Sequence, residues 1–427
     1  MANKIVPLDE YLNQVEKAGH TQAALAPSAK VENEDAFGSM KAHVLGLYKG
    51  VEATHSFEDD NGSIFDCIPI QQQPSLRGAA AATPTSLPTA DKKPAANAEA
   101  AANQQSIPIV APLSAGQKDR HGNARHCPEG HIPMRRVLLE EMARFKDVRQ
   151  FLQKSPTGGG RPPHSETPKS SHAKEDPIQA AVAATHRWAH AYQNVANLGG
   201  HDFINVWKPS IGANQIFSLS QHWYVGGSGG GLQTAEVGWQ VYPGLYGNSN
   251  PCLFIYWTAD GYQNTGCYNL SCTAFVQTSH VWTFGGALAP VSTYGGTQYE
   301  LQVAFYLYQG NWWLYLQGTD AAHAVGYYPT SIYKGGAMAT AAAEIDYGGE
   351  TVGTTSFPPM GSGHFASEGF GKACYQRDIY YFPTGGGGTY ANLTPSQAWP
   401  ACYTVQKVNY APPWNDTIYY GGPGGTC

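Results

Sequence analysis

The chain has 427 residues, of which 42% are hydrophobic, and its formal net charge is −6. This length predicts two or three domains, and the hydrophobic content is enough for a sizeable core. Because the charge is negative and no run of Lys or Arg is interleaved with aromatic residues, we expect no nucleic-acid binding. No apolar stretch reaches about 18 residues, so we expect no membrane-spanning segment.

Charged residues are spread unevenly along the chain. Residues 185–427 contain 11 Asp or Glu and six Lys or Arg, and they are rich in Gly, Tyr and Trp. Acid denaturation results largely from the protonation of carboxylates that are paired in the folded state. A domain with few carboxylates therefore has few groups whose protonation would unfold it. This composition suits an acidic environment, but a Gly-rich β domain of any kind would share it.

The cysteine content favours disulfides over zinc, because the number is even and no paired CxxC motifs occur. The N-terminus, MANKIVPLDEYLNQ, has no apolar region typical of a signal peptide. We therefore expect a secreted protein whose native leader is absent from this sequence. The eight cysteines are Cys67, Cys127, Cys252, Cys267, Cys272, Cys374, Cys402 and Cys427.

The first 153 residues are predicted to form a small mixed α+β domain. A short helix is expected in LDEYLNQVEKAG, and Asn61-Gly62 between alternating apolar residues indicates a hairpin. Residues 78–106 are rich in Ala and Pro and are interpreted as a flexible insert. Apolar residues at three- and four-residue spacing predict one amphipathic helix within residues 132–152.

A second composition change marks the main domain boundary. Residues 154–184 combine Pro, Gly, Ser and charge without periodicity, which predicts an exposed linker. Residues 185–427 alternate short aromatic and β-branched runs with Gly-rich turns, and QVAFYLYQ and NWWLYLQG form an expected hairpin across Gly310-Asn311. Such a pattern is typical of an all-β sandwich or barrel.

Residues 185–427 lack the sequence motifs of metal, serine and thiol catalytic sites. The histidines in this half are scattered without an HExxH motif, so we expect no metal and no cofactor. No GxSxG lies between a strand and a helix, and Gly361-Ser362-Gly363-His364 is interpreted as a tight turn. The loop CYNLSC suits a small disulfide better than a nucleophilic thiol. The histidines include His201, His222, His280, His323 and His364.

Paired carboxylates remain as the candidate chemistry. Strand alternation places Glu236 on one face with Thr234 and Gln240, and two glycines precede Glu350 and permit a bend that re-aims its side chain. Two acids whose pKa values are pushed apart can serve as base and acid. The pattern alone does not separate this pair from the competing acids Glu300, Glu344 and Asp346, or from solvated strand residues.

Several long motifs resemble the neprosin family. In the second half they are VGWQVYPGLYG at 237–247, LFIYWTADGYQNTGCYNLSCTAFVQ at 253–277, GGE at 348–350, MGSGHF at 360–365 and YYGGPGGTC at 419–427. In the first half, DCIPIQQQPSLR at 66–77 and CPEGHIPMRRV at 127–137 resemble the activation region of the same family. The two regions together cover most of the chain.

The resemblance implies a secreted zymogen of a glutamic peptidase that is active at acid pH and cuts after proline. Its fold would be a sandwich of two antiparallel sheets in residues 185–427, with Glu236 and Glu350 as catalytic residues. Residues 1–153 would block the groove as the enzyme's own inhibitor, until cleavage in the linker 154–184 releases them. Proline-containing peptides or proteins would be the substrate, and we expect a monomer.

Secondary roles follow from the same resemblance. It implies the disulfides Cys67–Cys127, Cys267–Cys272 and Cys402–Cys427, and by elimination we expect Cys252 to pair with Cys374. Independently of the resemblance, Gln240 lies on the predicted face of Glu236 and is a candidate donor to the oxyanion, with a structural role as the open alternative. Aromatic faces stack well on proline rings. The candidate proline-binding residues are therefore Trp239, Tyr256, Trp257 and Tyr268, although a plain core role is the favoured alternative for each.

Three other functions use the same features. A carbohydrate-binding β-sandwich also needs aromatic residues along a groove, and a glycoside hydrolase also uses two carboxylates. An inactive relative would keep the fold alone. Turnover of a peptide rather than a glycan would separate the peptidase from these alternatives.

Overall fold

The computed structural model describes residues 4–21, 28–88, 93–94, 107–113, 116–155, 184–410 and 414–427. The elements of the N-terminal part are α1 (Leu8–Lys17), α3 (Glu34–Leu47), β1 (His55–Glu58), β2 (Ile64–Pro69), β3 (His131–Arg135), α4 (Leu139–Met142) and α5 (Val148–Leu152). Those that follow are β4 (Thr185–Asn205), β5 (Gln215–Gly226), β6 (Gln233–Val241), α6 (Pro243–Tyr246), β7 (Cys252–Thr258), β8 (Val276–Gln277), β9 (Glu300–Tyr308), β10 (Asn311–Leu316), β11 (Ala324–Pro329), β12 (Ala342–Gly353), β13 (Cys374–Pro383), β14 (Thr389–Tyr390), β15 (Thr394–Gln397), β16 (Thr404–Asn409) and β17 (Asp416–Gly421).

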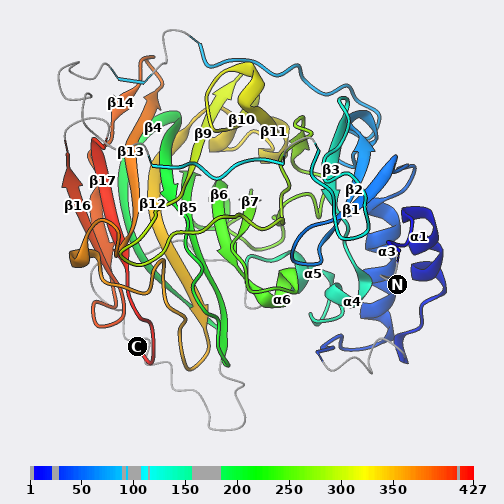
Figure 1. Ribbon diagram of the computed structural model, residues 1–427. Helices are drawn as coiled ribbons and strands as arrows, with labels where there is room; N and C mark the ends of the chain where they lie inside the picture. The colour runs from blue at the N-terminus through cyan, green and yellow to red at the C-terminus, as the bar shows by residue number, and fades with distance from the viewer. Residues whose placement is uncertain are drawn as a thin grey trace.

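The N-terminal part is a small α+β unit, as predicted, and it lies beside the β6–β7 edge of the large sheet (Figure 1). Helix α1 confirms the expected first helix, and it buries Leu8, Tyr11 and Val15 on one face. Strands β1 and β2 pair antiparallel across the loop that contains Gly62, whose φ of 85° suits glycine. Strand β3 adds to β2 and completes a three-stranded sheet.

The prediction of a single amphipathic helix within residues 132–152 is wrong. The first part of this range is β3, which pairs with β2 from Phe65↔Arg135 to Pro69↔His131. The backbone is extended again at Leu138, and only the two short helices α4 and α5 follow. The side chain of Asp147 accepts from the amide of Gln150 and starts α5 as a cap. Pairing with β2 therefore overrides the helical spacing of the apolar residues.

Residues 185–427 form an antiparallel β-sandwich, which confirms the predicted fold class. Hydrogen bonds connect 14 strands into one continuous sheet, and this sheet folds into two layers at β4. Residues 185–197 of β4 pair with β12, whereas residues 199–205 pair with β9. The change occurs at Gly199, whose φ is 121°, and a Cβ there would lie 2.0 Å from the carbonyl oxygen of Phe305. Only glycine fits this crossing.

The core lies between the two layers and is rich in aromatic side chains. From β5, the ring of Tyr224 stacks on Trp312 of β10, with centroids 5.9 Å apart. His222 of the same strand contacts Phe305 of β9. These two β5 residues therefore point into the sandwich. Because strand side chains alternate, Leu219, Gln221 and Trp223 point to the opposite, outer face of this layer. That outer face carries the candidate site.

The expected hairpin of β9 and β10 is confirmed. Tyr308 pairs with Asn311, and the two residues between them, Gln309 and Gly310, have φ values of 49° and 74°. Positive φ at both central positions is the geometry of a type I′ turn, which matches the twist of the flanking strands. The turn is thus centred on Gln309-Gly310, one residue before the pair that the sequence suggested.

Part of the predicted flexible insert packs on the sandwich. Residues 78–88 pass over β10 and β11 (Figure 1). The amide of Ala82 donates to the hydroxyl of Tyr327, and Tyr315 donates to the carbonyl of Thr85. Lys93 then forms an ion pair with Asp378 at 2.6 Å. Residues 89–92 and 95–106 lie outside the described part of the chain.

The three disulfides implied by the family resemblance are present: Cys67–Cys127, Cys267–Cys272 and Cys402–Cys427. The expected Cys252–Cys374 bond is wrong, because both thiols are free and buried. Cys252 begins β7 in one layer, whereas Cys374 begins β13 in the other. Burial raises both thiol pKa values to about 12. Buried free cysteines of this kind act as small hydrophobic side chains.

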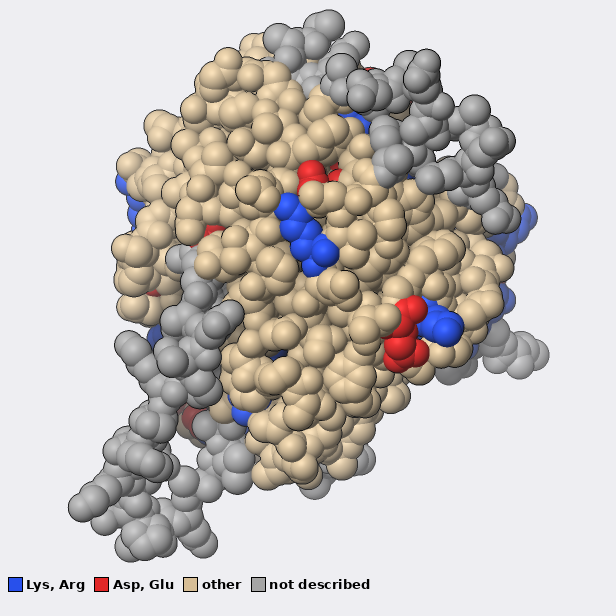
Figure 2. Space-filling view, turned by 90° about the vertical axis from the view of Figure 1, so that its left-hand side faces the viewer, with Lys and Arg blue, Asp and Glu red and all other residues tan. Residues whose placement is uncertain are grey.

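The surface over β13, β16 and β17 carries few and scattered charged side chains (Figure 2). This agrees with the low content of charged residues after residue 185. Among the helices that the structure describes, none has the length and apolar character needed to cross a membrane.

Candidate active site

Glu236 and Glu350 lie on the outer face of the same layer, on two strands that flank β5. Glu236 of β6 is the cross-strand partner of Trp223, and Glu350 of β12 is the partner of Leu219. Cross-strand partners share a face, and Leu219 and Trp223 are four residues apart on one strand. Both carboxylates therefore project from one surface, and neither is exposed.

The space between the two glutamates is kept open by glycines. Gln221 lies midway along β5, and its partners on the two neighbouring strands are Gly238 and Gly348. A Cβ at Gly238 would lie 2.8 Å from the Cβ of Gln221, and one at Gly348 would lie 2.6 Å from the Cα of His190. The glycines that precede Glu350 thus permit close strand packing, and Gln221 is the side chain left between the acids.

Glu236 is held by a set of hydrogen bonds from neutral groups. Its Oε1 accepts from the hydroxyls of Tyr262 at 2.7 Å and Thr234 at 2.8 Å. Its Oε2 accepts from Nε2 of Gln221 at 3.0 Å. Three donors fix this carboxyl group in one orientation inside a site without exposed surface.

The ammonium group of Lys154 lies between the two carboxylates. Its Nζ is 2.6 Å from Oε2 of Glu236 and 3.0 Å from Oε2 of Glu350, and all three side chains are fully buried. Burial lowers the pKa of Lys154, but the two carboxylates outweigh this and raise it above its ordinary value. The same ammonium lies over the rings of Trp223 and Tyr262, at 5.2 and 5.7 Å from their centroids.

Glu350 has a second partner of a different kind. Its Oε1 contacts Nδ1 of His186, the second residue of β4. Burial raises the pKa of Glu350, but Lys154 and then His186 outweigh this and hold it below its ordinary value. In this structure Glu350 is thus the carboxylate that two basic side chains stabilise.

The backbone around Lys154 occupies the surface beside the glutamates. Tyr268 donates from its hydroxyl to the carbonyl of Lys154 at 2.7 Å, and Nε2 of Gln240 donates to that hydroxyl at 3.0 Å. Tyr256 donates to the carbonyl of Leu152 at 3.4 Å. Lys154 and Ser155, which the sequence placed in an exposed linker, are therefore buried against this face. The rest of that predicted linker, residues 156–183, lies outside the described residues.

The predicted substrate-binding residues divide into two groups. Gln240, Tyr256 and Tyr268 lie on the face of the glutamates and contact residues 152–154 or each other. Trp239 does not, because it points into the sandwich and donates from Nε1 to the carbonyl of Asn205. Trp257 pairs with Ala235 on that inner side and contacts the ring of Tyr333. These two tryptophans are corrected to packing residues.

Two of the competing acids have ion-pair partners of their own, although Asp346 shares the face of the two glutamates as a cross-strand partner of Trp223. Glu300 forms an ion pair with Arg377 at 2.6 Å in the other layer. Asp346 lies on β12 and pairs with His190 at 2.7 Å. Glu344 is buried two residues before Asp346. In the described residues, no cluster of three or more His, Cys, Asp or Glu has a geometry that could hold a metal ion.

Sequence reasoning missed four residues of the site: Lys154, His186, Gln221 and Tyr262. Alternation along β5 could have placed Gln221 on an outer face, but it does not reveal which strands flank β5. Nothing in the local sequence around Lys154 shows that its side chain enters a site formed about 80 residues later.

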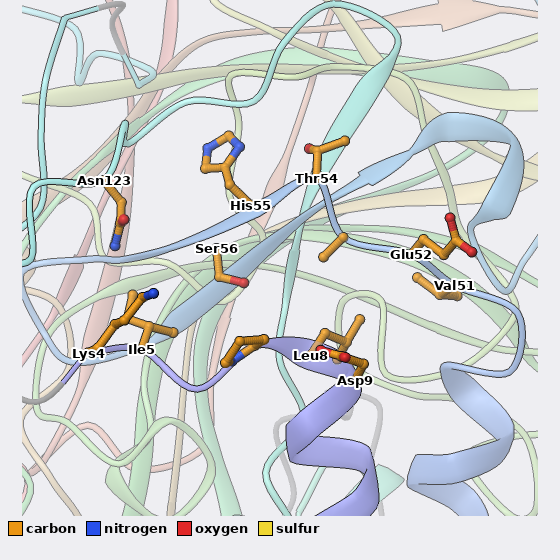
Figure 3. Close-up of a pocket in the computed structure, with 12 residues that line it drawn as sticks. Lys4, Ile5, Leu8, Asp9, Val51, Glu52, Thr54, His55, Ser56 and Asn123 are labelled. Carbon is orange, nitrogen blue, oxygen red and sulfur yellow. The ribbon is translucent and has the colours of Figure 1, made fainter.

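A pocket of about 570 Å³ lies elsewhere, between the segment before α1 and strand β1. Figure 3 shows Lys4, Asp9, His55 and Asn123 around it. None of its lining residues belongs to the site of the two glutamates. The pocket therefore marks a groove in the N-terminal unit, whereas residues 152–155 fill the candidate active site.

Comparison with known proteins places this site in a family. Residues 214–423, which include both glutamates, match the family model described as Neprosin. This part of the chain is a neprosin domain. Among solved structures, scytalido-glutamic peptidase with a transition state analog inhibitor matches at 10% identity and a TM-score of 0.32, covering 56% of this chain and 98% of that one. A second structure of this peptidase, with a peptide-based transition state analog, matches at 8% identity and a TM-score of 0.28, covering 56% and 99%. At these values the likeness does not bear on activity.

Proposed function

We propose that the chain is the latent form of a glutamic peptidase that uses Glu236 and Glu350 to activate water. The observation that carries this proposal is that one nitrogen atom contacts both carboxylates, at 2.6 and 3.0 Å. A water molecule in the place of Lys154 Nζ would be within hydrogen-bond reach of both. The neprosin domain match supports the assignment to a peptidase.

The proposed reaction is general acid–base hydrolysis of a peptide bond. One glutamate is ionised and takes a proton from the water, while the other is protonated and donates to the carbonyl oxygen of the scissile bond. Positioned proton transfer of this kind contributes about 10²–10⁴-fold in rate. Two buried carboxyl groups of unequal environment can divide these tasks.

The N-terminal unit is proposed to be the inhibitor. Lys154 occupies the site of the water, and the carbonyls of Leu152 and Lys154 accept hydrogen bonds from Tyr256 and Tyr268 as a bound peptide would. Substrate enters only when residues 152–155 leave. Protonation of either glutamate removes one of the two ion pairs of Lys154, so acid pH weakens this block. Maturation within residues 154–184, by self-cleavage after one of their prolines, remains part of the proposal.

Proline preference is supported by the aromatic residues around Lys154. Trp223, Tyr256 and Tyr262 line the space that the Lys154 side chain fills, and flat aromatic faces pack well on proline rings. A secreted location is proposed as well, because three disulfides form and persist in oxidising compartments.

The test is product analysis by mass spectrometry. A proline-rich protein is incubated with the full chain at about pH 3 and at pH 7, before and after the linker is nicked by an added protease that is then inhibited. New C-termini ending in proline, at acid pH only, are expected for the wild type. Glu236→Gln and Glu350→Gln should give none, whereas Glu344→Gln on the same strand should retain cleavage. Cleavage by both Glu236→Gln and Glu350→Gln, or no cleavage by the nicked wild type, would overturn the proposal.

A further inference from the structure

His186 is fixed in place beside Glu350 by contacts on all sides. Its Nδ1 contacts Oε1 of Glu350, and its Nε2 lies 3.0 Å from the hydroxyl of Ser155. Its ring stacks on Trp188 with centroids 5.4 Å apart and an interplanar angle of 18°. The edge of the ring of Phe217 packs against it at 6.3 Å. The imidazole therefore presents one nitrogen to the carboxylate in a single orientation.

The two glutamates differ in what remains when Lys154 leaves. Glu236 keeps Tyr262, Thr234 and Gln221, all of which are neutral donors. Glu350 keeps His186, whose side chain type carries a positive charge at acidic pH. An opposite charge within hydrogen-bond distance favours the ionised form of a carboxyl group more than a neutral donor does. The site is therefore asymmetric before any substrate binds.

We propose that His186 is a positioning residue that keeps Glu350 ionised in the open site, so that Glu350 is the general base and Glu236 the general acid. This assignment rests on the proposed function. Glu350 takes a proton from water as the water oxygen bonds to the carbonyl carbon, and Glu236 gives its proton to the carbonyl oxygen. The C–N bond then breaks as the nitrogen takes the proton from Glu350, and the proton on the former carbonyl oxygen returns to Glu236.

Other charged groups near His186 do not share this role. Arg187, the next residue, points to the other side of β4, where its guanidinium lies over Phe357 and Trp399. His190, four residues along β4, pairs with Asp346 instead. Glu236 and, in the latent form, Lys154 lie beside the His186–Glu350 pair, and Asp346, Glu344 and His190 lie on the same face further along β12 and β4. His190 thus provides a matched control on the same strand.

The test measures the protonation of Glu350 directly, without activity. The full chain with Lys154→Met is labelled with ¹³C at the glutamate side-chain carboxyls and titrated by NMR from pH 7 to pH 3. The signal of Glu350 is identified by its loss in Glu350→Gln. Adding His186→Asn, or His186→Gln as a second variant, should raise the titration midpoint of the Glu350 carboxyl by about one pH unit or more. Adding His190→Asn should change the midpoint of Glu350 much less than the loss of a charged partner does. An unchanged midpoint in both His186 variants would overturn the proposal.

A second measurement links His186 to catalysis. In the pH profile of kcat for peptide cleavage, the acidic limb of His186→Asn should move to higher pH by the same amount, with little change in KM. A uniform loss of kcat at every pH, with the limb unmoved, would show a merely structural role and overturn the assignment. If the wild type cleaves no peptide, the proposed function fails, and the NMR titration still decides whether His186 controls Glu350.

Discussion

The Nζ of Lys154 lies 2.6 Å from Oε2 of Glu236, and neither side chain is exposed to solvent. A buried ion pair is strongly destabilised when one partner is removed, because an uncompensated charge stays buried. Lys154 comes just after α5 in the N-terminal unit, whereas Glu236 lies on β6 of the neprosin domain. The contact therefore couples the docking of one unit to the ionisation of the other.

Replacing Lys154 with Met should weaken the block and permit activity at higher pH. The methionine fills similar volume but leaves the two glutamates without their shared cation, so the docked state loses both ion pairs. We expect the full chain with Lys154→Met to cleave a fluorogenic proline peptide at about pH 5 without a lag, while the wild type shows a lag. Lys146→Met is the control, because Lys146 is exposed and pairs with exposed Glu32 at 3.4 Å. Equal lags in wild type and Lys154→Met would contradict the prediction.

The stability of the full chain should fall on the acidic side in a way that depends on Glu350. Its pKa in the folded chain lies below the ordinary value, because Lys154 and His186 together outweigh the effect of burial, which raises it. A depressed carboxyl pKa stabilises the fold above the unfolded value, about 4.3 for glutamate, and this contribution is lost as the pH falls through the folded value.

Thermal unfolding between pH 6 and pH 2 measures this contribution. The wild-type Tm should decrease more steeply below about pH 4.3 than the Tm of Glu350→Gln, which has no proton to gain at this position. Carboxyl groups outside the site titrate equally in both proteins, so the difference between the curves reports on Glu350 together with its coupling to Glu236 through Lys154. Parallel curves over the whole range would show that Glu350 makes no such contribution.

The sequence predicted much of the β-sandwich because its physical signals are local. Alternation along residues 233–241 indicated the face of Glu236, and Gly310-Asn311 between two aromatic runs indicated the β9–β10 hairpin. Alternation does not say which strands are neighbours, however. That β5 lies between β6 and β12, with Gln221 facing two glycines, depends on pairings between distant segments.

Failures occurred where a long-range contact outweighed a local pattern. The apolar spacing in residues 132–152 favours a helix, but pairing with β2 converts its first part into β3. Composition around Lys154 is that of a linker, yet the two buried carboxylates give its ammonium a partner that no local pattern encodes. The bond between Cys252 and Cys374, predicted by elimination, is absent because a thiol can be buried without a disulfide partner.

Cys252 and Cys374 should react with a thiol reagent only in the unfolded chain. Both are fully buried, and this burial raises both pKa values to about 12, so little thiolate forms at neutral pH. Without a reductant, iodoacetamide at pH 7.5 should add nothing to the native chain. After denaturation it should add two groups, since the other six cysteines are in disulfides. Intact-mass measurement that finds no adduct after denaturation would restore the Cys252–Cys374 bond.

The hydroxyl of Tyr268 should bind a backbone carbonyl of the substrate, as it binds that of Lys154 at 2.7 Å in this structure. Gln240 donates to the same hydroxyl and orients its proton toward the carbonyl. Removing the hydroxyl in Tyr268→Phe deletes one hydrogen bond to substrate and leaves Gln240 without that acceptor. A bond of this kind contributes about 1 kcal/mol, so kcat/KM of the nicked enzyme should fall about five- to tenfold.

The control for Tyr268 is Tyr256→Phe on the adjacent strand. Tyr256 contacts the carbonyl of Leu152 at 3.4 Å, which is a long hydrogen bond, so its loss should lower kcat/KM less than the loss at Tyr268. Steady-state kinetics on one proline peptide at the acidic optimum compares the two variants. If the Tyr256 variant loses as much as the Tyr268 variant, the backbone of the substrate does not follow the path of residues 152–154. The latent segment would then block the site without imitating a bound peptide.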